Sequence, residues 1–400
     1  MRRIITLCIL PFIISLAFGY FFAIDKHVNE LLFLKKSSIY HPKLEFSSIE
    51  YFYNEPSYED QFLKCTDTNE TIFLIGSSEL TSSTKAIPFN FISKHFNSKL
   101  KAVGHAGNQC LSVYAQLLAN EQRLENAPIV IIISPGWFES KPSKGTSSPI
   151  FLEFNSERFL NRIIMNENNS MLHSYLYKRV AQLYNEFNSP SLELKLMNFK
   201  YLTSKSFIHN IIYSPLIFCD ELLLTIKEKI TPSAKYNNEL LKRPTIIPEP
   251  VSINWDSLFA FSREEVLKNS TNNNMGISDD YYNKYIHGRT GGHIEPVKEK
   301  FNQELEDFKM LMKLLKEKKV NASFIISPLN TLYFHNIKDI LPIIKIIEYE
   351  INYNGFPYIN LLETDPNKYD KAILNDIMHM SDYAWYKIDR FIIDTYHLNK

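Results

Sequence analysis

Five short, largely apolar runs rich in β-branched residues recur along this chain, separated by longer segments with helical spacing. The runs are residues 71–75 (TIFLI), 100–103 (LKAV), 129–134 (IVIIIS), 322–327 (ASFIIS) and 358–362 (YINLL). Such runs predict strands that are buried on both faces, because successive strand side chains point to opposite faces. The segments that predict helices include 109–124, 300–319 and 336–353. This alternation predicts a five-stranded parallel sheet covered on both faces, which is a doubly wound α/β domain.

A long insertion separates the third predicted strand from the fourth, from about Phe138 to about Glu299. It is rich in Tyr, Phe, Asn and Leu, and its pattern predicts mostly helices. Residues 231–252 contain four prolines and are predicted to form a loop or linker. We therefore expect one domain over residues 71–400 with a large, mostly helical insertion.

The N-terminal residues predict a membrane anchor. Residues 4–24 carry no charge and follow Arg2 and Arg3, and a run of this length can span a bilayer. The positive-inside rule then places the arginines in the cytoplasm and the remainder of the chain outside. A cleaved signal peptide is the alternative, because Ala17-Phe18-Gly19 forms a small-x-small site, although the apolar run continues beyond it. We expect a single-pass transmembrane anchor at 1–24 and a connecting segment at 25–70.

Composition narrows the class of protein. Of the 400 residues, 45% are hydrophobic and 14% aromatic, which is enough to bury a large core. Lys and Arg number 44 and are balanced by 44 Asp and Glu, so the whole-chain charge disfavours a nucleic-acid partner. Cys8 lies in the anchor, and the widely spaced Cys65, Cys110 and Cys219 allow at most one disulfide and form no Cys-x-x-Cys pair.

Three residues at predicted strand ends suggest nucleophilic chemistry. Ser78 follows Gly76 at the end of the first predicted strand, where a sharp turn is expected. Asp376 and His379 come after the last predicted strand, three residues apart, so both side chains can project from one side of a turn. In this arrangement the carboxylate orients the imidazole, and the imidazole activates the serine hydroxyl. Taken singly, a Gly-Ser-Ser strand end is more often a helix cap and an Asp-x-x-His is more often surface polarity.

The order of these motifs resembles that of known enzymes. Serine at the first strand end and Asp-x-x-His after the last strand is the arrangement of the SGNH (GDSL-like) hydrolases. The successive segments FLIGSSEL, GHAGNQCLS, ISPGWF, NWDSL with NNNMGISDDYYNKYI, FIISPLN and NDIMHMSDYAW resemble those of the DltD family over essentially the whole chain. This resemblance implies an extracytoplasmic SGNH-like domain on one membrane anchor, which helps to esterify teichoic acids with D-alanine.

The same resemblance implies residue roles and partners. The nucleophile, acid and base of the family fall on Ser78, Asp376 and His379, and the partners implied are a membrane-bound O-acyltransferase and an alanyl carrier system. The chain departs from the SGNH pattern where Ser77 stands in place of an Asp before the nucleophile, and where no Asn follows the third strand.

Residues near the strand ends are candidates for contacts with the substrate. The backbone N–H groups of Ser78 and Gly107 are candidates for an oxyanion hole, and Asn108 or Asn330 for its third donor. Trp137 is either a core residue or part of the acyl pocket.

No motif predicts a cofactor or a metal site. Gly288-Arg289-Thr290-Gly291-Gly292 lacks the Lys and the following helix of a phosphate loop, and is predicted to be a turn. The flanking His287 and His293 have no further ligands at metal-binding spacing beyond Glu295.

The leading interpretation is serine-dependent acyl transfer to a hydroxyl of an anionic, membrane-attached polymer, with the insertion acting as a lid that holds back water. Two alternatives stay open. One is an SGNH-type esterase that removes acyl groups from envelope glycans, and the other is a non-catalytic docking module for a carrier or acyltransferase.

Overall fold

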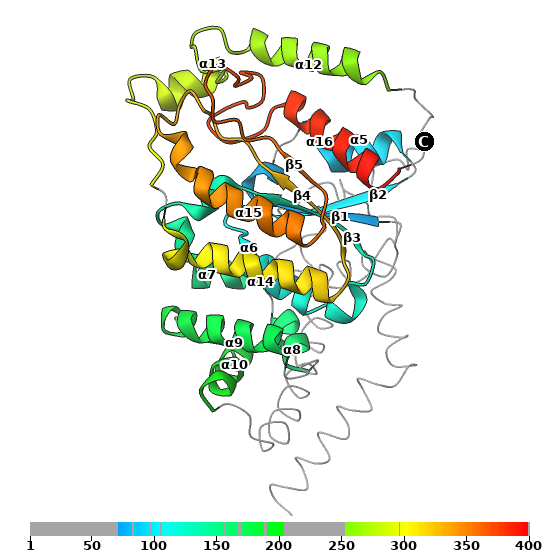
Figure 1. The fold of residues 1–400 in the computed structure, drawn as a ribbon, viewed down its shortest axis with the longest axis vertical. Coiled ribbons are helices and arrows are strands. Elements are labelled where there is room, and N and C mark those ends of the chain that lie inside the picture. The colour runs from blue at the N-terminus through cyan, green and yellow to red at the C-terminus, as the bar shows by residue number, and fades with distance from the viewer. Residues whose placement is uncertain are drawn as a thin grey trace, which may run out of the picture. The chain divides into compact units, whose positions relative to one another are not determined.

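The computed structural model describes nine stretches of the chain (Figure 1): 71–81, 84–96, 98–104, 106–155, 157–165, 170–187, 190–203, 253–295 and 297–398. The predicted anchor at 1–24, the connecting segment at 25–70 and the proline-rich residues 231–252 lie outside them. Among the helices in these stretches, none combines the length and apolar character needed to cross a bilayer.

The described residues contain the predicted five-stranded parallel sheet. Its strands are β1 (Thr71–Ile75), β2 (Lys99–Val103), β3 (Pro128–Ile133), β4 (Asn321–Ile326) and β5 (Tyr358–Asn360). They lie in the order β2-β1-β3-β4-β5, and every neighbouring pair is parallel. The chain leaves β1 toward one edge and crosses back to β3 on its other side. In open α/β sheets, ligand sites form at the carboxyl ends of the strands beside such a reversal.

Helices cover both faces of the sheet, as Figure 1 shows. One layer holds α5 (Pro88–His95) and α16 (Asp382–Thr395), and the other holds α6 (Cys110–Leu118), α14 (Gln303–Glu317) and α15 (Leu341–Tyr353). The three inner strands β1, β3 and β4 are buried at nearly every position, which explains their apolar character. The edge strands β2 and β5 are only partly buried.

Alternate strand residues build two cores. On the side of α5 and α16, Leu74 and Val130 belong to the same core cluster as the fully buried Trp385. In the other layer, the ring of Phe324 on β4 lies edge-on to that of Phe308 on α14, with ring centroids 6.3 Å apart. The doubly wound α/β arrangement expected from the sequence is therefore confirmed.

Residues of the expected insertion fall into two compact units. One unit includes α8 (Glu157–Met165), α9 (Met171–Leu183) and α10 (Leu192–Thr203), in which α10 packs on α8 and α9. The other unit contains the sheet together with α7 (Ser148–Phe154), α12 (Trp255–Lys268), α13 (Asp279–Tyr281) and a π-helix (Tyr282–Ile286). Short 3-10 helices occur at Ser78–Thr81, Glu121–Arg123, Pro135–Phe138, Pro142–Lys144, Tyr184–Glu186, Glu299–Phe301 and Ile337–Ile340.

Candidate active site

A tight turn follows β1 and presents Ser78. The Gly76 N–H continues the strand ladder by donating to the Val103 carbonyl at 3.0 Å, and a 3-10 helix begins two residues later. Gly104 has φ +149°, and a Cβ there would lie 1.9 Å from the Gly76 carbonyl oxygen. The turn thus requires glycine at position 104, because only glycine lets the loop after β2 approach the turn so closely.

A second turn, between β5 and α16, carries Asp376 and His379. The Asn375 N–H donates to the His379 carbonyl at 3.0 Å, which closes the turn. Asp376 Oδ1 accepts hydrogen bonds from the backbone N–H groups of Met378 at 2.8 Å and His379 at 2.7 Å. These local bonds set the direction of the carboxylate, because an Asx side chain that caps its own turn has little freedom left.

Ser78, His379 and Asp376 form a continuous hydrogen-bonded relay. His379 Nδ1 lies 2.7 Å from Asp376 Oδ2, and His379 Nε2 lies 3.2 Å from Ser78 Oγ. With Asp376 ionised, Nδ1–H donates to the carboxylate and leaves Nε2 free to accept the serine proton. The structure thus joins residues separated by 301 positions in the sequence.

The electrostatics of the relay favour a charged pair. Burial alone would raise the pKa of Asp376, but the hydrogen bonds from the His379 ring and from the backbone hold that pKa below its ordinary value. The hydrogen bond to Asp376 raises the pKa of His379 above its ordinary value, against burial, and the charge of Glu79 adds to the effect. The Asp376 side chain is 11% exposed and that of His379 is 41% exposed, so the imidazole is accessible to substrate while the carboxylate is shielded.

Glu79 is a neighbour of the relay to which the sequence had assigned no role. It is 7% exposed, and its Oε1 accepts the Ser77 N–H at 2.8 Å, which braces the turn that holds Ser78. Burial raises the pKa of Glu79, and the positive charge of His379 acts in the opposite direction. An acidic residue directly after the candidate nucleophile, in a turn that follows a buried strand, was the signal available in the sequence.

Asn108 is fully buried and positions the nucleophile turn. Its Nδ2 donates to the Gly76 carbonyl at 2.9 Å. In the described part of the chain its Oδ1 has no hydrogen-bond partner. This contact ties the loop after β2 to the residue that precedes the two serines.

Asn330 holds the loops of the candidate site together. It is fully buried, and its Nδ2 donates to the backbone carbonyls of Met275 at 3.1 Å and Asp376 at 3.5 Å. Its Oδ1 accepts the backbone N–H groups of Leu332 and Tyr333. Because its amide donors and its carbonyl are engaged in these bonds, Asn330 acts as a scaffold for these loops. The sequence had made it one of two candidates, with Asn108, for the third oxyanion donor.

Gly107 and Trp137 also lie in loops at the carboxyl ends of strands. Gly107 has φ +94°, and a Cβ there would lie 2.9 Å from the Ile150 side chain, so this position requires glycine. Trp137 lies in the 3-10 helix after β3 and is 8% exposed, which makes it largely a core residue.

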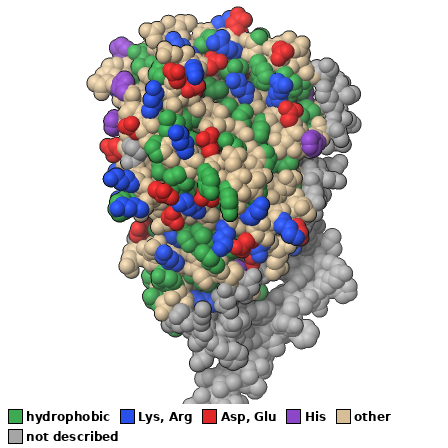
Figure 2. All heavy atoms as spheres, viewed as in Figure 1, with side chains coloured by type: hydrophobic (Ala, Val, Ile, Leu, Met, Phe, Trp, Pro, Cys, Tyr) green, Lys and Arg blue, Asp and Glu red, His purple; other side chains and the backbone are tan. Residues whose placement is uncertain are grey.

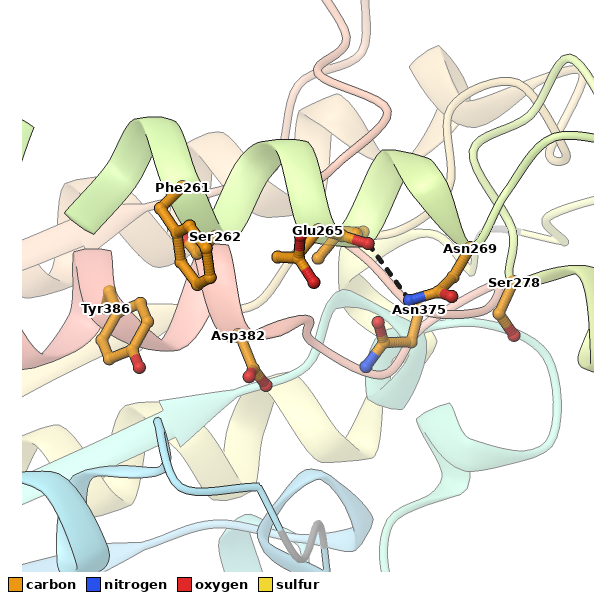
Figure 3. A pocket seen from close by; sticks show the side chains of 9 residues that line it. Phe261, Ser262, Glu265, Asn269, Ser278, Asn375, Asp382 and Tyr386 are labelled. Carbon is orange, nitrogen blue, oxygen red and sulfur yellow. Dashed lines mark hydrogen bonds between the residues drawn. The ribbon is translucent and has the colours of Figure 1, made fainter. Parts of the chain in front are cut away.

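A pocket of about 380 Å³ lies between α12 and α16, beside the turn that carries Asp376. Figure 3 shows Asp382, Tyr386 and Asn375 below α12, with Glu265 and Phe261 on that helix. Ser78 and His379 do not line it. The pocket therefore flanks the relay and does not contain it.

The described residues contain no group of three or more His, Cys, Asp or Glu side chains that could hold a metal ion. Cys110 is buried with a free thiol, and its N–H donates to Glu304 Oε1 at 2.8 Å. On the face drawn in Figure 2, basic and acidic side chains are interspersed.

Comparisons with known proteins match most of this chain to a single family. A family model described as "DltD protein" matches residues 54–397. "Protein DltD" of Staphylococcus aureus (strain NCTC 8325 / PS 47) is 22% identical over 357 residues, which cover 85% of this chain and 86% of that protein. "Protein DltD" of Bacillus subtilis (strain 168) is 22% identical over 372 residues, which cover 86% of each chain.

Proposed function

Because this chain belongs to the DltD family, we propose that it acts in the D-alanylation of teichoic acid or a related envelope polymer, as an acyltransferase in which Ser78 carries the D-alanyl group. The observation that supports this most directly is the relay in which His379 lies 3.2 Å from Ser78 Oγ and 2.7 Å from Asp376. Such an arrangement makes a serine hydroxyl nucleophilic.

In the proposed first step, Ser78 Oγ attacks the carbonyl carbon of an activated D-alanyl donor, and its proton passes to His379 Nε2. The tetrahedral intermediate collapses, and the bond from the carbonyl carbon to the leaving group of the donor breaks. That leaving group takes the proton from His379, so the D-alanyl group is left as an ester of Ser78. Asp376 stabilises the imidazolium through its bond to Nδ1 in both proton transfers.

In the second step, a hydroxyl of the acceptor polymer attacks the same carbonyl carbon. His379 Nε2 removes the proton of that hydroxyl and returns it to Ser78 Oγ as the acyl–serine bond breaks. We place this reaction outside the membrane, with residues 1–24 as the single-pass anchor and a membrane-bound O-acyltransferase with an alanyl carrier system as the source of the acyl group.

The decisive experiment compares Ser78→Ala with Ser77→Ala in cells that lack the wild-type chain. Both variants remove one hydroxyl from the same turn, and it is Ser78 Oγ that lies 3.2 Å from His379 Nε2. We expect Ser78→Ala to abolish D-alanine esters in the envelope at normal protein levels, while Ser77→Ala retains most of them. Wild-type ester content in Ser78→Ala cells would reject the acyl-serine mechanism and favour a docking module.

One observation supports an esterase as a second candidate. The His379 side chain is 41% exposed, so water can approach the base as well as a polymer hydroxyl can. Release of acid from a model ester by the purified full chain, with and without added polyol acceptor, separates the two reactions. Transfer predicts that the acceptor diverts the acyl group, whereas an esterase releases acid at the same rate in both mixtures.

A further inference from the structure

The helical unit that includes α8, α9 and α10 brings three helix ends together. Residues 184–191 alone separate α9 from α10, and such short connections join antiparallel neighbours. This pairing agrees with the position of Lys200, near the end of α10, whose Nζ lies 5.5 Å from the centre of the Tyr177 ring on α9. Residues 166–170 join α8 to α9 and reach at most about 20 Å when fully extended. The last turns of α8 and α10 and the first turn of α9 therefore lie at one end of the unit, the α9 N-terminal end.

Large apolar side chains from all three helices are exposed at the α9 N-terminal end. Met165 is the last residue of α8 and Met171 the first of α9, and they are 60% and 62% exposed. In the last two turns of α10, Phe199 is 47% exposed, Tyr201 44% and Leu202 68%. Phe199 and Leu202 are three residues apart and so lie on one face of that helix. Exposed apolar side chains gathered in this way mark an interaction surface.

Charge is distributed unevenly between the two ends of this unit. The carboxylates among its described residues are Glu157 at the start of α8, Glu186 in the 3-10 helix after α9, and Glu193 in the first turn of α10. All three lie at the α9 C-terminal end. The α9 N-terminal end has instead two cations, Arg162 and Lys200, in the last turns of α8 and α10. Burial lowers the pKa of Lys200 only to about 8, so this side chain stays charged at neutral pH.

An apolar end with nearby cations and remote carboxylates is suited to the interface of an anionic bilayer. Apolar side chains enter the boundary between headgroups and acyl chains to a depth of about 5–10 Å, and tyrosine is also favoured there. Arg162 and Lys200 lie within one helical turn of the exposed apolar residues, and cations so close to a membrane surface attract anionic headgroups. A symmetric contact with a second copy of the chain would instead bring like charges together, which disfavours that occupant.

We propose that the α9 N-terminal end of this helical unit inserts into the interface of an anionic bilayer, through Met165, Met171, Phe199, Tyr201 and Leu202. The contact is additional to the predicted anchor at 1–24. It fixes the orientation of the helical unit against the membrane, whereas a single anchor leaves the unit free to turn. This inference does not depend on the acyl-serine mechanism.

Tryptophan fluorescence of the full chain in nanodiscs tests this contact. Leu202→Trp places a reporter at the α9 N-terminal end. Asn185→Trp is the matched control, because Asn185 is also exposed but lies beside Glu186 at the other end. Each disc holds one chain, and its phosphatidylglycerol carries bromine atoms on the part of the acyl chains next to the headgroups, where they quench a tryptophan that has entered the bilayer. The signal of the 3 native tryptophans, measured on wild type, is subtracted.

We expect the bromine atoms to quench Leu202→Trp at least about threefold more than Asn185→Trp, because only an inserted residue comes within reach of the acyl chains. Brominated phosphatidylcholine should quench Leu202→Trp less, and adding Lys200→Gln to the reporter chain should reduce this difference between the lipids. Met171→Trp should behave as Leu202→Trp does. It serves as a second reporter at the same end in case one replacement disturbs its own helix.

Quenching of Leu202→Trp and Met171→Trp no stronger than that of Asn185→Trp would overturn the lipid contact. Equal quenching in the two lipids would reject the preference for anionic headgroups. Emission from Leu202→Trp that is shifted to the blue but unquenched would show that protein covers this end, and a blue shift in detergent micelles that grows with protein concentration would identify that protein as a second copy. Either result would overturn the assignment to lipid.

Ser78→Ala separates this inference from the proposed function, because Ser78 lies in the other compact unit. The Leu202→Trp reporter should be quenched to the same extent in Ser78→Ala and in the chain with the native serine. If the reporter is unquenched while Ser78→Ala cells lack D-alanine esters, the lipid contact is wrong and acyl transfer stands. If the reporter is quenched while Ser78→Ala cells keep their esters, the acyl-serine mechanism is wrong and the lipid contact stands.

Discussion

Replacing Asp376 by Asn tests the relay with little change in shape. In the wild-type chain, Oδ1 accepts two backbone N–H groups and Oδ2 accepts the His379 Nδ1–H at 2.7 Å. Asparagine can keep an oxygen in the place of Oδ1, where it accepts the two backbone N–H groups. In the place of Oδ2, however, it presents an NH₂ group to the His379 ring. Nδ1 must then accept, so the single ring proton moves to Nε2, and Nε2 can no longer take the Ser78 proton.

The expected loss of acylation rate in Asp376→Asn is about 10⁴-fold, which corresponds to about 5.5 kcal/mol of transition-state stabilisation. The free energy of unfolding should fall by only about 1–3 kcal/mol, the cost of one hydrogen bond to a charged group. Asp376→Ala, which loses the two backbone bonds as well, should be less stable than Asp376→Asn but similarly inactive.

Single-turnover acylation by a model ester measures the rate, and urea denaturation measures the stability. Asp370→Asn is the matched control, because Asp370 shortly precedes Asp376 in the sequence but pairs with the exposed Arg263 instead of with the relay. We expect it to acylate within about threefold of wild type, since exposed ion pairs contribute little. If Asp376→Asn also stays within this range while Ser78→Ala is inactive, Asp376 does not orient the base.

Two further predictions concern the nucleophile turn. Gly104→Ala should lower the free energy of unfolding by about 3 kcal/mol, because its Cβ would lie 1.9 Å from the Gly76 oxygen at φ +149°, whereas at Gly136 the nearest atom would be 3.6 Å away. Equal urea midpoints for Gly104→Ala and the control Gly136→Ala would contradict this. Glu79→Gln keeps an acceptor for the Ser77 N–H but removes the charge that helps to raise the pKa of His379. Since activity appears as His379 loses its proton with rising pH, the acid limb of the acylation profile should move to lower pH, and an unmoved limb would show that Glu79 carries no charge there.

Local pattern was sufficient to predict the strands and the principal helices. The segment 71–75 was expected as a strand and is β1, and 336–353 was expected as a helix and contains α15. Apolar side chains in these segments recur with the period of the element that buries them, so the signal lies within each segment. The convergence of Ser78 and His379 was also predictable, because parallel strands bring their carboxyl ends, and the loops that follow, to one edge of the sheet.

The roles of Asn330 and Asn108 were decided by tertiary structure alone. An asparagine can donate to an oxyanion or to a carbonyl, and which it does depends on which backbone approaches it. For Asn330 the neighbours are the carbonyls of Met275 and Asp376, which lie 55 and 46 positions away in the sequence. The sequence determined which groups were available for chemistry, while the packing of distant loops determined which of them were left free, since a buried amide can form hydrogen bonds only with the groups that the fold places beside it.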